Sequence, residues 1–78
     1  MVPKLIRLPV VLSHTGLSRS SLYNRIQDGL WPKPVTLGSR AVAWPEEEVA
    51  AINAARIAGR TNEEIHRLVV ELETIRKP

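Results

Sequence analysis

The first apolar residues of the chain recur at helical spacing. Leu8, Val11 and Leu12 fall on one face of a 3.6-residue turn, and Pro9 suits a first helical turn because it has no amide proton to leave unpaired. Gly16 follows, and a glycine can adopt the left-handed conformation that ends a helix. The pattern therefore predicts a helix that begins near Leu8 and ends before Gly16.

A second helix is predicted directly after this glycine. Ser18 is a favourable N-cap, Leu22 and Ile26 form a narrow apolar stripe, and Gly29 provides a C-terminal stop. We expect this helix to occupy residues 18–28. Two short helices joined by so tight a turn predict a helix-turn-helix.

The next segment predicts a β-hairpin. Pro32 and Pro34 keep the chain extended and prevent a helix. Short apolar stretches at 35–37 and 41–44 then flank turn residues, which fit either a two-residue loop or a three-residue loop that includes Arg40. Both loops put Arg40 at or beside the tip of the hairpin.

A third helix is expected to begin at Pro45 and to end before Gly59. Glutamates occupy positions 46–48, in the first turn, where the positive end of the helix dipole favours acidic side chains. Val49 and Ile52 mark the face of this helix that we expect to be buried.

The last segment opens with the spacing of a capping box, Thr61 followed three residues later by Glu64, and predicts a final helix. Its apolar stripe consists of Ile65, Leu68, Val69, Leu72 and Ile75. So short a helix is marginal alone, and the stripe must be buried either on its own domain or against a second copy. In the second case Ile65, Leu68, Leu72 and Ile75 would form the interface of a homo-oligomer. We thus expect a mainly α fold with a small β-hairpin: a winged helix-turn-helix domain over 4–58 and a C-terminal amphipathic helix over 59–78.

Composition narrows the functional classes. The chain has 78 residues and no cysteine, which excludes disulfides, thiolate zinc sites and cysteine nucleophiles. Its apolar runs are too short for a membrane span, so we expect a cytoplasmic protein without a membrane partner. Net charge is +3, but residues 1–45 hold six basic residues and one acidic residue, whereas residues 46–78 hold five basic and seven acidic ones. A polyanion would prefer the front half, although a solvated basic surface without a partner is the alternative.

The helix at 18–28 combines a small apolar stripe with a polar face. Ser20, Asn24 and Gln27 share the side opposite Leu22 and Ile26. Asparagine and glutamine can bond an adenine edge with two hydrogen bonds, and hydroxyls bond several base edges. The face therefore suits base reading in a DNA major groove, with a merely solvated polar face as the alternative.

Further residues suit contacts with the phosphate backbone. Free amides at the helix start, Arg19 and the serine hydroxyls can hold a phosphate, and Lys33 and Arg40 can reach the adjacent backbone or a minor groove, or simply solvate their turns. Trp31 and Trp44 fit the hairpin core better than a base-stacking surface. The candidate DNA contacts are Ser18, Arg19, Ser20, Ser21, Tyr23, Asn24, Gln27, Lys33 and Arg40.

From Leu8 to Arg56 the sequence resembles the AlpA family of small prophage-type transcriptional regulators, which are winged helix-turn-helix proteins related to phage excisionases and to MerR-like DNA-binding domains. The residues that match are TGLSRSSLYNRI, Gly29, PKPVTLGSR, Trp44 and Glu48-Val49. The resemblance implies that Arg19, Ser20, Tyr23 and Asn24 lie on the recognition helix and Arg40 on the wing. Trp31 departs from the family's usual phenylalanine and Ala51 from a common tryptophan, and we interpret both as changes in core packing.

The expected function is sequence-specific binding of double-stranded DNA by a prophage-type transcriptional regulator, with helix 18–28 in the major groove and wing 35–44 on the flanking backbone or minor groove. One alternative is an excisionase, whose protein partner would be an integrase. A transcriptional regulator would instead work with RNA polymerase. A second alternative is a protein-interaction module that docks through the last helix. Catalysis, a metal and a cofactor are not expected, because His14 and His66 lack metal-motif spacing and no glycine-rich phosphate loop occurs.

Overall fold

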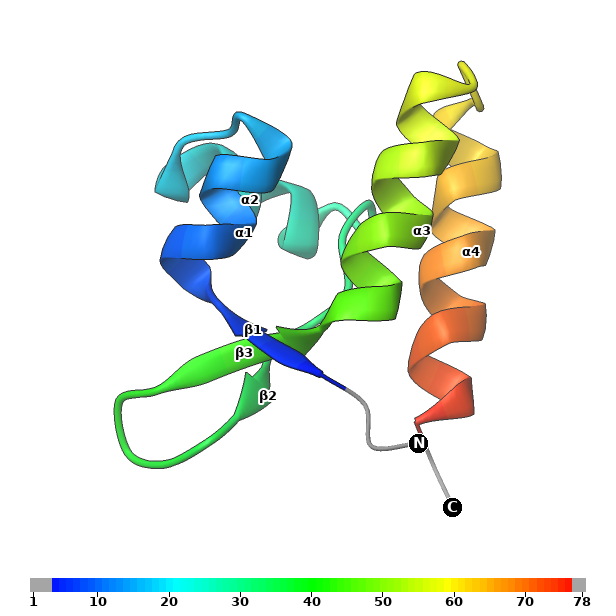
Figure 1. Cartoon of the computed structure of the whole chain (residues 1–78). Coiled ribbons are helices and arrows are strands. Elements are labelled where there is room, and N and C mark those ends of the chain that lie inside the picture. Colours follow the sequence, from blue (N-terminus) through cyan, green and yellow to red (C-terminus); the bar gives the residue numbers. More distant parts are fainter. Residues whose placement is uncertain (1–3, 77–78) are drawn as a thin grey trace.

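The chain forms four helices and a small antiparallel sheet in a computed structural model, which describes residues 4–76. In chain order the elements are β1 (Leu5–Arg7), α1 (Leu8–Thr15), α2 (Arg19–Gln27), β2 (Val35–Thr36), β3 (Val42–Pro45), α3 (Glu46–Ile57) and α4 (Asn62–Ile75). In Figure 1 helices α1 and α2 lie above the sheet, and the pair α3 and α4 lies next to them, beyond the end of β3. The expected winged helix-turn-helix architecture, mainly α with a small sheet, is confirmed.

The helix-turn-helix follows from capping chemistry that is written locally in the sequence. Pro9 occupies the first turn of α1, and Gly16 ends this helix with a φ of 71° while its amide donates to the Leu12 carbonyl at 2.9 Å. Ser18 caps α2, since its Oγ accepts from the amide of Ser21 at 3.2 Å. The turn between the two helices is therefore held at both ends, as the sequence predicts.

The wing is the hairpin of β2, β3 and the loop 38–40 between them. Val35 pairs with Ala43 in antiparallel register, and the amide of Leu37 donates to the carbonyl of Ala41 at 2.8 Å. Of the two loop lengths that the sequence allowed, the structure has the three-residue one. Arg40 is exposed in this loop, so its predicted place at the hairpin tip is confirmed.

A third strand was not predicted from the sequence. Strand β1 pairs with β3, with Ile6 opposite Trp44, and the sheet has the order β1-β3-β2. The hairpin expectation was therefore incomplete, because β1 has only three residues and its partner lies far along the chain. Pairing on both edges makes β3 the central strand and buries Ala43 and Trp44.

One apolar core joins the four helices to strands β1 and β3. Trp44, Leu22 and Ile52 are each less than 2% exposed, and Trp31 is 3% exposed, which confirms that both tryptophans belong to the core. The C-terminal helix enters the same cluster through Ile65 and Val69, with Leu68 and Leu72 packed against it. Ile75, the last residue of the expected stripe, is 70% exposed. Most residues of that stripe therefore pack against the chain's own core.

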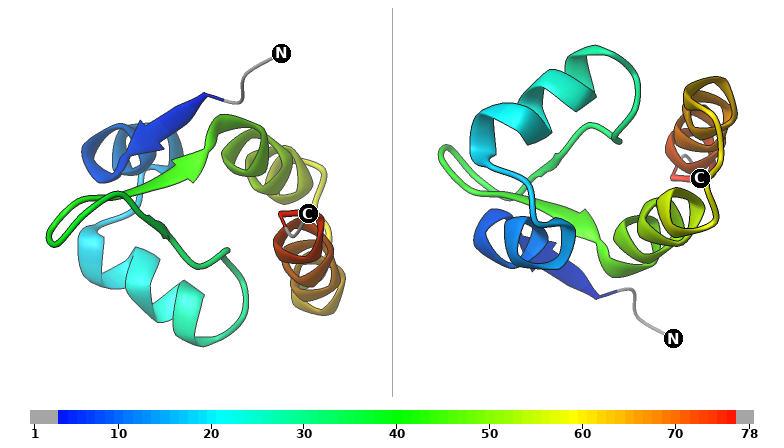
Figure 2. Two further views of the ribbon diagram at one scale, coloured as in Figure 1. Left: turned by 90° about the horizontal axis from the view of Figure 1, so that it is seen from below. Right: turned by 90° about the horizontal axis from the view of Figure 1, so that it is seen from above.

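Helices α3 and α4 lie side by side, as Figure 1 and both views of Figure 2 show. The expected capping box opens α4: the amide of Glu64 donates to Thr61 Oγ1 at 3.2 Å, and the amide of Thr61 donates to Glu64 Oε1 at 3.0 Å. Two backbone amides at the helix start, which have no partner within the helix, thereby gain hydrogen-bond acceptors. These contacts fix where the C-terminal helix begins.

Candidate nucleic-acid interface

Helix α2 presents its polar face to solvent. Leu22 is fully buried and Ile26 half-buried against the core, whereas Ser20, Asn24 and Gln27 on the opposite side are exposed. The separation follows from the sequence, because residues four and seven apart return to the same side of a helix. No other part of residues 4–76 covers these three side chains enough to bury them.

The start of α2 is a compact hydroxyl cluster. The Ser18 hydroxyl donates to Ser21 Oγ at 2.9 Å and lies 3.5 Å from Ser20 Oγ. The amide of Ser21 is occupied by the cap, and the first intrahelical bond runs from the Leu22 amide to the Ser18 carbonyl at 3.0 Å. The predicted group of free amides is thereby reduced to those at the very start of the helix, beside the exposed Arg19.

The remaining predicted contacts are distributed over two surfaces. Tyr23 lies on the flank of α2 and is 40% exposed. Arg40 projects in the wing loop, and Lys33 is exposed in the segment before β2. The wing loop and the first turn of α2 lie on the same side of the molecule, away from α3 and α4 (Figures 1 and 2). The wing loop and the start of α2 are therefore accessible from one direction.

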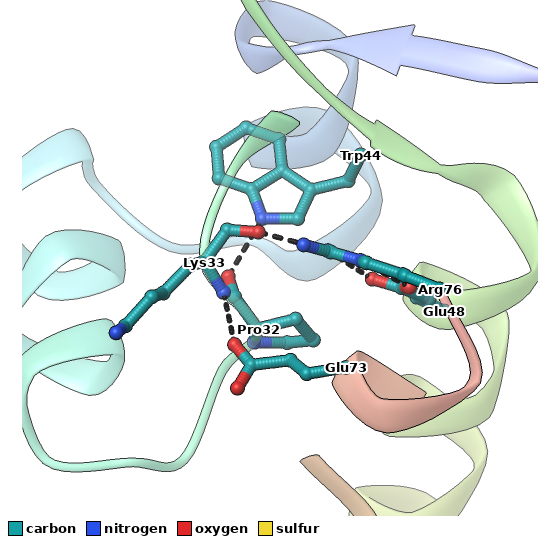
Figure 3. A network of polar contacts seen from close by, with 6 residues as sticks. All are labelled: Pro32, Lys33, Trp44, Glu48, Glu73 and Arg76. Carbon is teal, nitrogen blue, oxygen red and sulfur yellow. Dashed lines mark hydrogen bonds and ion pairs between the residues drawn. The ribbon is translucent and has the colours of Figure 1, made fainter. Parts of the chain in front are cut away.

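The segment that connects α2 to the wing is held by the C-terminal helix. The amide of Lys33 donates to Glu73 Oε2 at 2.8 Å, and Arg76 Nη2 donates to the carbonyl of the same residue at 2.8 Å. The Lys33 side chain extends away from Glu73 and Arg76 (Figure 3). His66 Nδ1 donates to the carbonyl of Gly29 at 3.0 Å. Helix α4 therefore holds both ends of residues 29–33 through hydrogen bonds. Among residues 4–76 the Lys33 ammonium has no ion-pair partner.

An ion pair between Arg76, which follows α4, and Glu48 links these contacts to α3. Arg76 Nε donates to Glu48 Oε2 at 2.7 Å, and Arg76 Nη2 also contacts the second carboxylate oxygen. The side chains of Glu48 and Arg76 are 7% and 24% exposed, and the bond to the Glu48 carboxylate raises the pKa of Arg76. The sequence explains Glu48 only as one of three glutamates favoured at a helix start. In the structure its side chain is buried and pairs with Arg76, 28 residues away.

Trp44 fixes the same segment from the sheet. Its indole Nε1 donates to the carbonyl of Pro32 at 2.8 Å, inside the core (Figure 3). A buried indole needs such an acceptor, since an unpaired N–H in the interior is costly. The two prolines predict an extended segment, but these anchoring contacts lie 12 to 43 residues apart in sequence and have no local signal.

Two arginines that the sequence did not single out lie near one another behind α2. Arg25, in the last turn of α2, and Arg56, in the last turn of α3, are half-buried and line one pocket. The pKa of Arg56 is lowered, first by burial and then by the charge of Arg25. A helical wheel shows that Arg25 does not share the face formed by Ser20 and Asn24. It cannot show that Arg25 lies near Arg56.

Other kinds of site are not apparent in the part of the chain that the structure describes. Within residues 4–76 no three histidine, aspartate or glutamate side chains come together as metal ligands. In the same range, each helix is too short or too polar to cross a bilayer.

Comparison with known proteins adds independent information. The family described as Prophage CP4-57 regulatory protein (AlpA) matches residues 4–56. The chain is 47% identical over 57 residues to the uncharacterized protein ORF88 of Enterobacteria phage P4, over 73% of its own length and 65% of that protein, just under two thirds. It is 33% identical over 52 residues to the DNA-binding transcriptional activator AlpA of Escherichia coli K12, over 59% of its own length and 74% of that protein. The family match ends before α4 begins.

Proposed function

The chain belongs to the family of the prophage CP4-57 regulatory protein (AlpA), and we propose that it is a transcriptional regulator that binds double-stranded DNA. Membership of a family of regulatory proteins supports this function, as does the likeness to an Escherichia coli protein named a DNA-binding transcriptional activator. The cationic front half of the chain, which contains the helix-turn-helix and the wing, fits a polyanionic partner.

In this proposal α2 enters the major groove and reads base edges. The observation that supports it most directly is the exposed, uncharged face of Ser20, Asn24 and Gln27 opposite the buried Leu22. A helix diameter matches the width of a major groove, and amide side chains can make paired hydrogen bonds to adenine. Charged side chains would bind phosphates regardless of sequence, whereas this face suits discrimination among bases.

Cationic and hydroxyl groups around that face are proposed to fix the protein on the backbone. Arg19, Ser18, Ser21 and Tyr23 surround the start and flank of α2 and would contact phosphates of one strand. Arg40 on the wing would reach the flanking backbone or minor groove. Lys33, whose side chain is exposed while its backbone is bonded to Glu73 and Arg76, would add a further phosphate contact.

We further propose that α4 belongs to the DNA-binding unit and does not serve as a docking helix. Ile65 is fully buried and Leu68 and Leu72 pack against the core, so three of the four residues expected in an oligomer interface are engaged inside the chain. The bonds from Glu73 and Arg76 to the backbone of Lys33 give α4 a role in setting the distance between α2 and the wing. This packing argues against an interaction module built on that stripe.

Transcriptional regulation is favoured over excision because the Escherichia coli relative is named a DNA-binding transcriptional activator. A regulator of this kind would act with RNA polymerase, whereas an excisionase would act beside an integrase. A single module of this size buries roughly 600 to 1,000 Å² on DNA, so several copies on neighbouring sites are expected to give useful specificity. Binding sites at a promoter would support transcriptional regulation. Clustered sites at a prophage attachment region would instead support the excisionase function.

Selection of bound genomic fragments, followed by fluorescence anisotropy with the best fragment, tests the proposal. Arg19→Ala and Arg40→Ala should each weaken binding and lower the slope of log K against log salt by about 1, because each loses a phosphate contact. Arg67→Ala is the matched control, since this arginine is an exposed cation on α4. If all three variants bind alike, the assignment of Arg19 and Arg40 is wrong.

A further inference from the structure

A pocket of about 210 Å³ lies behind the recognition helix. Thr15 and Leu17 from the turn of the helix-turn-helix, Arg25 from α2, and Asn53 and Arg56 from α3 contribute to its lining. Arg25 leaves α2 about 140° around the helix axis from Ser20, because five residues separate them at 3.6 residues per turn. The pocket is therefore a different surface from the face proposed to read bases.

The charge inside this pocket is uncompensated. Arg25 and Arg56 both line it, and no aspartate or glutamate does. Arg56 Nη1 donates to Asn62 Oδ1 at 3.1 Å, which is a neutral acceptor. Burial and then the nearby charge of Arg25 lower the pKa of Arg56, as expected for a cation without an acidic partner in the pocket. Two cations held near one another in a partly desolvated place favour the binding of an anion.

Two residues that line the pocket carry buried donors without acceptors. Within residues 4–76, Trp31 Nε1 and Arg56 Nε make no hydrogen bond, and both nitrogens are shielded from solvent. Trp31 as a whole is only 3% exposed, and it lines the same pocket. Buried N–H groups are nearly always paired in folded proteins, so two such groups at one pocket require an explanation.

We propose that this pocket is a binding site for an oxyanion of the phosphate class. Arg25 and Arg56 line the pocket from the ends of two different helices. Guanidinium donors from separate directions suit the tetrahedral acceptors of a phosphate better than the planar pair of a carboxylate. A bound phosphate would neutralise the repulsion between Arg25 and Arg56 and link the end of α2 to the end of α3. The phosphate group belongs either to a small free ligand or to the backbone of the duplex.

The two tryptophans make the test internally controlled. The uniformly ¹⁵N-labelled full chain is titrated with inorganic phosphate, and with sodium chloride at matched ionic strength, while the two indole N–H signals are followed by NMR. The Trp31 signal should move saturably with phosphate. The Trp44 signal should stay in place, because its N–H already donates to the Pro32 carbonyl. A Trp31 signal that does not saturate, or that chloride moves equally, overturns the proposal.

Variants then locate the site. Arg25→Gln and Arg56→Gln should each weaken phosphate binding at least tenfold, whereas Arg7→Gln, which removes the same charge from an exposed position on strand β1, should leave it within twofold. The titration of the parent chain decides the proposal even if one variant does not fold. Equal binding by folded Arg25→Gln, Arg56→Gln and Arg7→Gln proteins would contradict it. Acetate that saturates the Trp31 signal as tightly as phosphate would overturn the choice of ligand class.

A final arm adds a duplex and identifies the source of the phosphate. If the duplex itself moves the Trp31 signal and free phosphate no longer titrates, the DNA backbone supplies the group. If phosphate still titrates in the complex, the ligand is a separate small molecule. The titration without DNA does not depend on the proposed DNA function, so a chain that fails to bind any duplex leaves the result for the pocket intact.

Discussion

Removal of the Arg76 side chain tests how strongly the C-terminal helix holds the rest of the protein. Arg76→Ala deletes both hydrogen bonds to the Glu48 carboxylate and the bond to the Lys33 carbonyl. Glu48, whose side chain is 7% exposed while Arg76 is present, would lose its charged partner. A buried charge left unpaired costs about 3–5 kcal/mol, and the 24% exposure of Arg76 places this case at the lower end, about 3 kcal/mol.

Thermal unfolding followed by circular dichroism measures this loss. With about 4–8 °C per kcal/mol for a chain of this size, the melting temperature should fall by roughly 12 °C or more. Arg67→Ala is the control, because Arg67 pairs with Glu63 on the same helix at 2.8 Å, but with side chains 74% and 75% exposed. Such a surface pair contributes about 0.5 kcal/mol or less.

A double variant separates the cost of the unpaired charge from the loss of packing. Arg76→Ala combined with Glu48→Gln should be more stable than Arg76→Ala alone, because no buried charge is then left without a partner. If Arg76→Ala and Arg67→Ala lose the same stability, the ion pair does not anchor α4 and the reasoning from burial is refuted.

Two further predictions concern local structure. The pKa of Glu64 is lowered from its usual 4.5, first by the hydrogen bond from the Thr61 amide and then by the one from its hydroxyl, so the ionised carboxylate stabilises the fold above pH 4.5 and this contribution is lost as pH falls through the lower folded value. Glu64→Gln should therefore lose less stability than the parent in urea titrations below pH 4.5, and an equal loss would contradict the cap. Gly29→Ala and Gly16→Ala both force alanine to a positive φ, 77° and 71°, at about 1–2 kcal/mol each, but only at Gly29 would the new Cβ lie 2.6 Å from His66 Nδ1. Gly29→Ala should lower the melting temperature further, through the lost His66 bond worth about 1 kcal/mol, and equal melting temperatures would show that the ring moves freely.

The elements that the sequence predicted well are those with local signals. Gly16 ends α1 and Ser18 begins α2 through contacts within a few residues, and Thr61 begins α4 in the same way. The exposed face of α2 was predictable for a similar reason, since periodicity alone separates Asn24 from Leu22.

The features that the sequence did not predict depend on contacts between distant segments. Strand β1 is three residues long and exists because it pairs with β3. Glu48 obeys a local preference for acidic residues at a helix start, yet its orientation is set by Arg76. The proximity of Arg25 and Arg56 likewise arises from the packing of α2 and α3, which no spacing in the sequence encodes.

The central claim, that α2 reads bases, is tested most directly by a ratio of affinities. Dissociation constants for a random duplex and for the selected fragment are measured at one salt concentration for the parent chain and for Asn24→Ala. The account predicts that the ratio falls by about 5- to 150-fold, equivalent to 1–3 kcal/mol for one lost bidentate base contact, while binding to the random duplex is unchanged. An unaltered ratio, or an equal loss on both duplexes, would contradict it.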